Sequence, residues 1–321
     1  MRIPAIVMAV VVCFVAAAQA QSYPDRPIHI IAPFPPGGLA DVLARAVGDE
    51  IAKTLGQPVI VENKAGAGGN IGADVVAKAA PDGYTLMMSS AGILTANPFL
   101  YAKMPFDAET AFVPISNVAE MPMLVVVHPK VQAKTLAELV ALARAQPGKL
   151  NFGSPGVGTT GFLGLTMFMH AANVKFTHVP YRGAAPALGD LIAGQIDGVV
   201  DNPPTVMQHI MDGRLRALAV TAKTRMAQLP DVPTTAEAGV ANYEASSWFG
   251  VVAPAGTPPA IIARLHREIV AALRQPAMQE RFAKSGARLV GDSPSEFAAQ
   301  IRMERGKWGE IIRAANIKME Q

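Results

Sequence analysis

The chain has 321 residues, with 28 Lys and Arg residues against 25 Asp and Glu residues and a formal net charge of +3. This near-balance, with no run of basic residues, argues against a nucleic-acid groove, so we expect no nucleic-acid partner. About 300 residues are enough for two domains of ordinary size.

The start of the chain predicts a secretory signal peptide at residues 1–20. The positive residue Arg2 precedes an apolar run at Ile6–Ala18, and Ala18-Gln19-Ala20 has the A-x-A pattern of a cleavage site. The apolar run is too short for a membrane anchor that spans the bilayer. The single cysteine, Cys13, lies inside this segment, so the remaining chain has no disulfide and no cysteine-based metal site. Together these features predict export to a bacterial periplasm.

Strand-like apolar runs alternate with helical patterns along the rest of the chain. The predicted strands are Ile28–Ala32, Val59–Glu62, Leu86–Ser89, Leu124–His128, Leu150–Gly153, Phe176–Val179, Gly198–Asp201, Leu215–Ala222 and Phe249–Ala253. The predicted helices are Ala40–Thr54, Ile71–Ala79, Thr135–Arg144, Phe162–Ala172, Ala184–Ala193, Pro259–Arg274, Ala277–Lys284 and Ser295–Ala314. Strands that alternate with helices of this length predict parallel sheets in an α/β protein.

Two loop regions indicate where the chain crosses between domains. Pro105–Pro122 is loop-rich, and Ala241–Ser247 is polar; each precedes a strongly apolar run. If both are crossings, the middle of the chain forms one lobe and the two ends form the other. The predicted division is lobe I at residues 21–122 plus 246–321 and lobe II at residues 123–245.

Two strand–glycine–helix turns repeat one design. Ile28–Ala32 leads through PFPPGG (residues 33–38) into a helix, and Leu150–Phe152 leads through GSPGVGTTG (residues 153–161) into another. The start of a helix suits a phosphate, an oxyanion or a carboxylate. Ligands of open α/β sheets bind at the carboxyl ends of strands. The two turns therefore predict two domains that face one ligand cleft.

A third glycine-rich stretch, GAGGNIG at Gly66–Gly72, does not fit a nucleotide-binding motif. The dinucleotide fingerprint G-x-G-x-x-G fails because Ile71 stands where the third glycine belongs, and the chain has no P-loop lysine pattern. Two interpretations stay open for this stretch. It is either a tight turn before a helix or a third backbone-lined wall of the cleft, since glycine lets the main chain approach a ligand closely.

The sequence shows no catalytic or metal-binding constellation. Ser154 does not satisfy the nucleophile pattern G-x-S-x-G, because Phe152 stands two residues before it. The six histidines show no H-E-x-x-H or other metal spacing. His178 is either a structural histidine or a group that reaches the cleft. We therefore expect no catalytic residue, no metal and no cofactor.

Small polar groups at the ends of predicted strands are the candidate ligand contacts. They are Ser89, Ser90, Ser154, Thr159, Thr160, Asp201 and Asn202. Hydroxyls and helix N-termini hold a carboxylate without a full positive charge, which limits the desolvation penalty of burying an ion pair. Asp41, in the first turn of its helix, is either a favourable N-terminal charge or an acceptor for water or for a donor group of the ligand.

Larger side chains near these loops have alternative roles. Arg182 is either a cationic contact near the cleft or a solvated surface arginine. Phe34, Tyr181 and Trp248 are candidates to pack on an organic ligand, although Trp248 fits a core position at the crossing. The apolar stretch Ala91–Ile93 suits a hydrophobic or aromatic ligand body.

Four separated stretches carry a resemblance to a known family. They are PFPPGGLADVLAR (33–45), VENKAGAGGNIGADVVAKAAPDGYTL (61–86), NFGSPGVGTTGFL (151–163) and VPYRGAAPALGDLIAGQIDGVVDN (179–202). In this order they resemble the Bug family of periplasmic solute-binding proteins, the receptors of tripartite tricarboxylate transporters. The resemblance extends from Tyr23 to about Met319.

The resemblance implies a type II periplasmic-binding fold, in which two α/β lobes of mixed sheet flanked by helices close on a ligand by a hinge. It also implies that the turn Pro35–Gly38, with Asp41, grips a ligand carboxylate through main-chain groups and ordered water. Ser154–Thr160 would face that carboxylate from the other lobe. The predicted ligand contacts are Phe34, Pro36, Gly37, Gly38, Asp41, Ser89, Ser90, Ala91, Ser154, Gly158, Thr159, Thr160, Tyr181, Arg182 and Asp201.

The predicted function is that of a monomeric periplasmic solute-binding protein, not an enzyme. It captures a small mono- or dicarboxylate, aromatic acids included, and delivers it to membrane transporter subunits. The absence of an arginine cluster disfavours a highly charged ligand such as citrate. One alternative is a sensor that presents its closed form to a membrane receptor kinase. Another is an exported hydrolase or isomerase, against which the failed G-x-S-x-G pattern argues.

Overall fold

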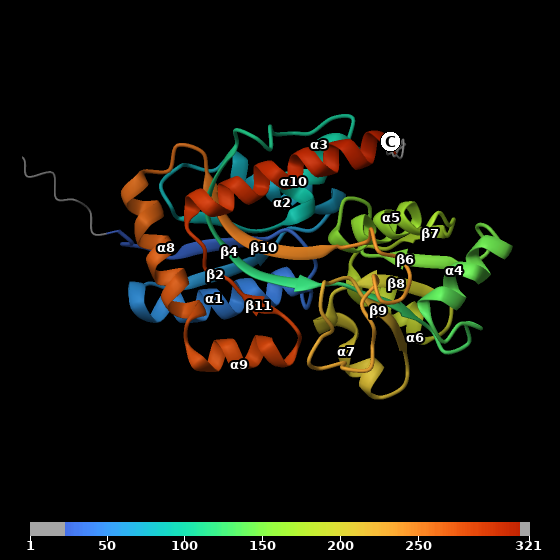
Figure 1. The fold of residues 1–321 in the computed structure, drawn as a ribbon. Coiled ribbons are helices and arrows are strands. Elements are labelled where there is room, and N and C mark those ends of the chain that lie inside the picture. Colours follow the sequence, from blue (N-terminus) through green and yellow to red (C-terminus); the bar gives the residue numbers. More distant parts are fainter. Residues whose placement is uncertain (1–22, 315–321) are drawn as a thin grey trace, which may run out of the picture.

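Two mixed β-sheets lie side by side and organise the molecule (Figure 1). The computed structural model describes residues 23–314, and the predicted signal peptide at residues 1–20 lies outside them. The six-stranded sheet has the order β11 (Arg288–Leu289), β4 (Phe112–Pro122), β10 (Ser246–Pro254), β3 (Thr85–Ser90), β1 (Ile28–Ala32), β2 (Val59–Asn63). The five-stranded sheet has the order β7 (Thr177–Pro180), β6 (Asn151–Ser154), β8 (Gly198–Asp201), β5 (Leu124–Val127), β9 (Arg216–Val220). The predicted α/β class is confirmed, and so are the mixed sheets that the resemblance implies. The parallel sheets predicted from the alternation of strands and helices are wrong for β4, β5, β9, β10 and β11, which pair antiparallel.

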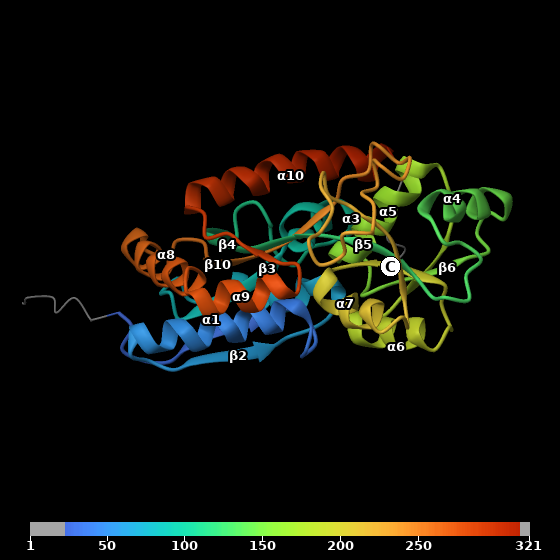
Figure 2. The ribbon, with the colours of Figure 1, turned by 60° about the horizontal axis from the view of Figure 1, so that its bottom comes forward.

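Helices flank both sheets. Those around the six-stranded sheet are α1 (Leu39–Leu55), η1 (Ala67–Gly69), α2 (Asn70–Ala77), η2 (Gly92–Ala96), α3 (Asn97–Leu100), α8 (Pro259–Leu273), α9 (Pro276–Lys284) and α10 (Pro294–Ala314). Those around the five-stranded sheet are α4 (Leu136–Ala145), α5 (Thr160–Ala172), α6 (Ala184–Ile192) and α7 (Pro203–Met211). Figure 2 shows α10 on one side of the six-stranded sheet and α1 and α9 on the other. Each sheet with its helices is named a lobe, lobe I for the six-stranded sheet and lobe II for the five-stranded one.

Helix α1 fixes the position of the first glycine turn. Leu43, Val47 and Ile51 are spaced four residues apart on one face and are fully buried in the core that α1 shares with β1 and β3. Burying each of these side chains contributes roughly 1.5–3 kcal/mol. The helix ends at Leu55, and Gly56 has a φ of 69°, a left-handed conformation that suits glycine. The buried face therefore holds the start of α1 at the carboxyl end of β1.

The chain crosses between the lobes where β4 leads into β5 and where β10 begins. The prediction of a loop at residues 105–122 is wrong for residues 112–122, because they form β4 and pair antiparallel with β10. A register shift in this pairing lies beside Pro114, at the kind of irregularity where a sheet tolerates proline. The pairing joins segments far apart in the sequence, so no local pattern indicated it.

The lobe boundaries at residues 122/123 and 245/246 stay a prediction. Every strand of each sheet comes from one of the two predicted sets of residues. Helix α10 contacts both lobes, however. Its first half packs Phe297 on Trp248 of β10, with ring centroids 5.1 Å apart, and its second half places Trp308 in the same apolar cluster as Phe168 of α5.

Helix α7 was not predicted, although it supplies part of the site described below. Its first two residues are Pro203 and Pro204, which stand at positions where a helix accepts proline because those N–H groups have no partner within the helix. The short elements η2, α3 and β11 were not predicted either.

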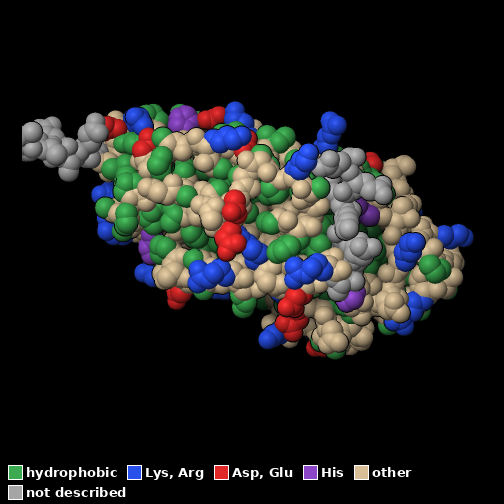
Figure 3. Space-filling model, turned by 90° about the horizontal axis from the view of Figure 1, so that it is seen from above, with side chains coloured by type: hydrophobic (Ala, Val, Ile, Leu, Met, Phe, Trp, Pro, Cys, Tyr) green, Lys and Arg blue, Asp and Glu red, His purple; other side chains and the backbone are tan. Residues whose placement is uncertain are grey.

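The outer surface over α10 is mixed in character. Figure 3 shows basic and acidic side chains scattered among hydrophobic ones on this face. Within residues 23–314, no helix combines the length and the apolar character needed to cross a membrane.

Candidate functional site

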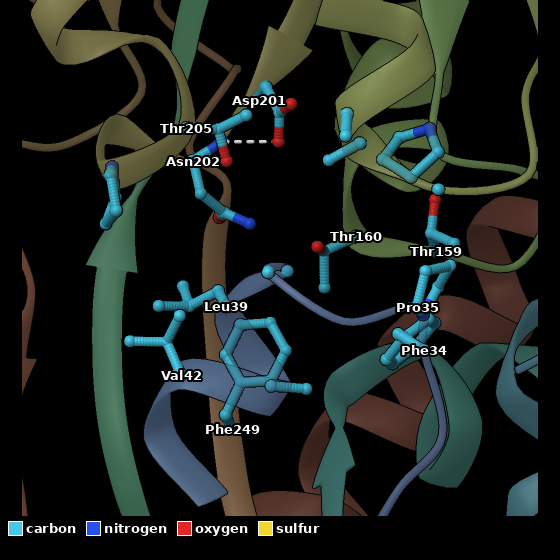
Figure 4. Close-up of a pocket in the computed structure, with 18 of the residues that line it drawn as sticks. Phe34, Pro35, Leu39, Val42, Thr159, Thr160, Asp201, Asn202, Thr205 and Phe249 are labelled. Atoms are coloured by element: carbon cyan, nitrogen blue, oxygen red, sulfur yellow. Dashed lines mark hydrogen bonds between the residues drawn. The ribbon is translucent and has the colours of Figure 1, made fainter. Parts of the chain in front are cut away.

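A cavity of about 430 Å³ lies between the two lobes, a volume within the range of small-molecule sites. Lobe I contributes Phe34, Pro35, Pro36, Gly37, Gly38, Leu39, Ala40, Val42, Ser90, Phe249, Arg281, Phe282 and Ser285. Lobe II contributes Pro155, Thr159, Thr160, Gly183, Ala184, Ala185, Pro186, Leu188, Asp201, Asn202, Pro204 and Thr205. The lining is mainly apolar, and its polar groups come from strand ends and helix starts. Figure 4 shows many of these side chains around the cavity.

The first glycine turn brings the N-terminus of α1 to the cavity. Gly38 caps the helix without a side-chain hydrogen bond, and Val42 N is the first amide to donate within the helix, to Gly38 O at 3.0 Å. The amides of Leu39 and Ala40, both cavity-lining residues, have no acceptor among the described residues. Unpaired amides and the helix dipole give this wall a partial positive charge.

Asp41 holds this turn together. Its carboxylate accepts hydrogen bonds from Gly37 N, Arg45 Nε and Asn63 Nδ2, each at 3.0 Å. Burial alone would raise the pKa of Asp41, but these donors and the Arg45 charge outweigh burial and lower it. Asp41 does not line the cavity. The Gly37 amide is directed to Asp41, so it is not available to a ligand.

The second glycine turn brings the N-terminus of α5 to the cavity. Thr159 Oγ1 donates to Gly156 O at 2.6 Å and accepts from Phe162 N at 3.4 Å, so this hydroxyl caps the helix. The next residue, Thr160, also lines the cavity, and its hydroxyl has no partner among the described residues. Thr160 thus offers a free hydroxyl, whereas Thr159 is committed to the turn.

Helix α6 adds a third N-terminus on the lobe II side. Its cap, Gly183, has no side chain, and Gly183 N donates to Pro155 O at 3.0 Å. Ala184 and Ala185 follow in the cavity lining, and their amides have no acceptor among residues 23–314. Helices α1, α5 and α6 therefore all begin at this cavity.

Ser154 and His178 form a hydrogen bond of 2.7 Å between Oγ and Nε2. This is the type of pair that the hydrolase alternative requires. Ser154 is fully buried and accepts from Gly156 N at 3.2 Å, and neither residue lines the cavity. Burial lowers the pKa of His178 and favours its neutral form. The pair therefore supports the second turn and lies outside the cavity lining.

Asp201 is the acidic side chain in the cavity lining. It stands at the end of β8, is 4% exposed, and accepts one hydrogen bond, from Asn202 N to Oδ1 at 2.7 Å. Burial raises its pKa to about 7, because the single amide donor compensates only part of the desolvation. Oδ2 has no donor among the described residues. This oxygen is therefore available to a bound molecule.

The apolar side of the cavity is formed by aromatic and aliphatic side chains of lobe I. Figure 4 shows Phe249, Leu39 and Val42 together on one side, away from Asp201. Ser90 lies opposite Phe249 in the pairing of β3 with β10, and its buried hydroxyl has no partner within residues 23–314. This side can cover the hydrocarbon part of a ligand.

The structure brings eight of the predicted contact residues to the cavity and leaves seven outside its lining. Those in the lining are Phe34, Pro36, Gly37, Gly38, Ser90, Thr159, Thr160 and Asp201. Those outside are Asp41, Ser89, Ala91, Ser154, Gly158, Tyr181 and Arg182.

Two of the residues outside the lining, Tyr181 and Arg182, were predicted to contact the ligand directly, the first through its aromatic ring and the second through its positive charge. Tyr181 donates to Asp190 Oδ2 at 2.7 Å, and burial together with Asp190 raises the pKa of Tyr181 to about 12. Arg182 is exposed. The basic side chain in the lining is instead Arg281, in the last turn of α9, where an arginine gives no signal of a binding role.

The glycine stretch at residues 66–72 lies behind the cavity wall. It turns into α2, and a Cβ at Gly69 would lie 2.5 Å from Ile93 Cδ1 and 3.2 Å from Phe34 Cζ. None of its residues lines the cavity. Of the two interpretations, the tight turn before a helix describes the structure, and the third wall of the cleft does not.

Side-chain hydrogen bonds join the two lobes. Tyr101 of lobe I donates to Val157 O of lobe II at 3.2 Å, and Gln228 of lobe II donates to Ala283 O of lobe I. A separation of the lobes would break both bonds. In residues 23–314, no group of three or more His, Cys, Asp or Glu side chains is placed to hold a metal ion.

Residues 43–317 match the model of the tripartite tricarboxylate transporter family receptor, TctC. The chain belongs to this receptor family. Protein BugT of Bordetella pertussis is 39% identical over 320 residues, which cover 98% of each chain. A protein of Pseudomonas sp. (strain P51), from the tcbD-tcbE intergenic region, is 39% identical and covers 92% of this chain and 88% of its own.

Solved structures of similar proteins share the fold. The periplasmic binding protein BugD has a TM-score of 0.87 and 35% identity, over 92% of this chain and 100% of that one. An R. palustris protein with adipate has a TM-score of 0.89 and 35% identity, over 92% and 100%. MatC from Rhodopseudomonas palustris, with bound malate, has a TM-score of 0.86 and 32% identity, over 90% and 100%. The predicted Bug-family membership and periplasmic-binding fold are confirmed.

Proposed function

We propose that this receptor captures a small organic carboxylate in the periplasm and delivers it to the membrane subunits of a tripartite tricarboxylate transporter. The observation that carries the proposal is the convergence of the N-termini of α1, α5 and α6 on one apolar cavity. The unpaired amides of α1 and α6, the Thr160 hydroxyl of α5 and the three helix dipoles attract a carboxylate. The adipate and malate bound to two similar proteins support the same ligand class.

Neutral donors suit reversible capture. A carboxylate at Leu39, Ala40 and Thr160 exchanges water for several hydrogen bonds, without the desolvation cost of burying a cation beside it. The hydrocarbon body packs on the apolar side of the cavity, where Phe249 and Val42 lie. A mono- or dicarboxylate of modest size, aliphatic or aromatic, fits a cavity of about 430 Å³.

Residues 1–20 direct export and are then removed. The protein acts as a monomer, and lobe closure is stabilised by ligand contacts that the open form lacks. It performs no chemical reaction on its ligand and uses no cofactor.

A thermal-shift screen tests the ligand class. The purified protein is mixed with mono-, di- and tricarboxylates, acidic amino acids, and benzoate- and pyridine-type acids. A ligand at 100 times its Kd adds about 2.7 kcal/mol to the free energy of unfolding, which raises Tm. A shift with one class of acid supports the proposal. If no acid shifts Tm, and mass spectrometry of the denatured protein finds no acid retained through purification, the proposal is wrong.

A further inference from the structure

Asp201 is an unpaired acid in a cavity that otherwise attracts anions. It is the only acidic side chain in the lining formed by the described residues, it is 4% exposed, and its Oδ2 has no donor among them. Figure 4 shows Asp201 with Asn202 and Thr205 on a different side of the cavity from Thr159 and Pro35. The cavity therefore has one region formed by helix starts and another in which the Asp201 carboxyl lies beside the Asn202 amide and the Thr205 hydroxyl.

We propose that Asp201 determines specificity: it selects carboxylates that carry a hydroxyl or ammonium group at their far end over carboxylates with a second carboxylate there. The proposal rests on the function proposed above, because the first carboxylate must lie at the starts of α1, α5 and α6. The far end of the ligand then faces Oδ2 of Asp201. A hydroxyl or an ammonium group on the ligand donates to this oxygen, whereas a second carboxylate on the ligand is repelled by the negative charge of Asp201.

The start of α7 leaves this region without a free backbone amide, so its donors are the side chains of Asn202 and Thr205. A helix start normally presents free amides, but the first two residues here, Pro203 and Pro204, have no N–H. The next amide, Thr205 N, donates to Asn202 O at 3.0 Å. The Asn202 amide is already bonded to Asp201 Oδ1. No backbone amide of this turn is therefore left for a second carboxylate.

The groups packed around Asp201 supply no compensating charge. Neither β5 nor β6 has a titratable side chain. Helix α5 has only His170, in its last turn, and α7 has only His209, with Asp212 at its C-terminal cap. Arg281 of α9 is the basic residue of the cavity lining, but it is not among the groups that shift the pKa of Asp201. A donor on the ligand is thus the available partner for Oδ2.

Burial decides the protonation state in the free protein. It raises the pKa of Asp201 to about 7, so the group is mainly a carboxylate at pH 8 and mainly a carboxylic acid at pH 6. At pH 8 the unpaired carboxylate favours a donor on the ligand. At pH 6 the protonated group is itself a donor, and the penalty on a second carboxylate disappears.

Calorimetry with four acids of equal chain length tests the proposal. The probes are hexanoate, 6-hydroxyhexanoate, 6-aminohexanoate and adipate. At pH 8 the wild-type protein should bind the hydroxy and amino acids about tenfold tighter than hexanoate or adipate, the range expected for a hydrogen bond to a charged group. In Asp201→Asn, the affinity for adipate should rise relative to that for hexanoate. The affinity for 6-aminohexanoate should no longer exceed that for hexanoate. The control Asp212→Asn removes the same charge at the far, exposed end of α7 and should leave the ranking unchanged.

A pH series on the wild-type protein gives a readout that does not depend on a variant. Adipate should bind about tenfold tighter at pH 6 than at pH 8, while hexanoate should change little. The proposal is overturned if adipate binds at pH 8 as tightly as 6-hydroxyhexanoate, or if Asp201→Asn leaves the ranking unchanged. It is also overturned if other acids bind and none of the four does. Failure of every acid to bind the wild-type protein instead contradicts the proposed function itself.

Discussion

Two buried aspartates at strand–helix turns, Asp41 of lobe I and Asp201 of lobe II, have opposite environments. Asp41 accepts from three donors, one of them a guanidinium, and its pKa is lowered. Asp201 accepts from one backbone amide, and its pKa is raised to about 7. Both are 4% exposed. The three donors around Asp41, together with the deeper position of the Asp201 carboxyl, therefore separate an acid that builds the site from one that is free to contact a ligand.

The largest expected effect concerns stability against pH. Folding raises the pKa of Asp201 from about 3.9 to about 7, so the folded state holds a proton that the unfolded state releases. The free energy of unfolding therefore falls as pH rises through this window. Asp201→Asn should remove this loss and be more stable than the wild type at pH 8, by about 4 kcal/mol at most. Urea unfolding at pH 8, pH 5 and pH 3 measures the difference, which should fall to about 1.5 kcal/mol at pH 5 and vanish near pH 3, below the unfolded pKa.

Substitution of Asp41 should destabilise the protein, whereas substitution of Asp201 should stabilise it. Asp41→Asn removes the charge that Arg45 pairs with and weakens the acceptor for Gly37 N. It should cost about 2–3 kcal/mol at pH 7, within the range for buried hydrogen bonds to a charged group. The loss should shrink as pH falls, because the lowered pKa makes this contribution disappear in acid. Equal urea stabilities of the variant and the wild type at pH 7 would contradict the structural role of Asp41.

The two threonines at the start of α5 give a sharper, smaller contrast. Thr160→Val removes a free hydroxyl from the cavity and should weaken carboxylate binding about fivefold with little change in Tm. Thr159→Val removes the helix cap and should lower the free energy of unfolding by about 1 kcal/mol. Calorimetry and thermal melts on both variants separate the roles. If Thr160→Val binds acids as the wild type does, its hydroxyl is not a ligand contact.

The smallest expected effect tests whether the charge on Arg45 matters to the turn. Its side chain is half exposed, and exposed pairs spaced i,i+4 contribute about 0.3–0.5 kcal/mol. Arg45→Gln should therefore change Tm only slightly and leave carboxylate affinity unchanged. A large loss of affinity would mean that Arg45 contributes its charge to the ligand, which the partners of Asp41 do not suggest.

The sequence predicts the elements that position the site because their signals are local. Apolar residues that recur on one helical face indicate α1, and the glycines after Ile28–Ala32 indicate the turn that precedes it. Thr160 and Asp201 follow or end predicted strands, and this position correctly indicates that they line the cavity. The sequence does not distinguish the structural role of Asp41 from the ligand-facing position of Asp201. One partner of Asp41, Asn63, lies at the end of β2, so a local pattern around Asp41 does not reveal it.

The missed parts depend on contacts between distant segments. Strand β4 exists because it pairs with β10, and no pattern within residues 112–122 fixes that partner. Helix α7 begins with two prolines, which resemble a loop unless the helix start is already known. Arg281 and Phe282 line the cavity, and Figures 1 and 2 show their helix, α9, on the side of lobe I near α7 of lobe II.

One calorimetric comparison tests the central claim most directly, that the starts of α1, α5 and α6 together hold a carboxylate. The acid with the largest thermal shift and its primary amide, which has the same shape without the charge, are titrated into the wild-type protein. Helix N-termini favour an anion over a neutral group, so the acid should bind at least about tenfold tighter than the amide. Equal affinity for the two would contradict the anion site at these helix starts.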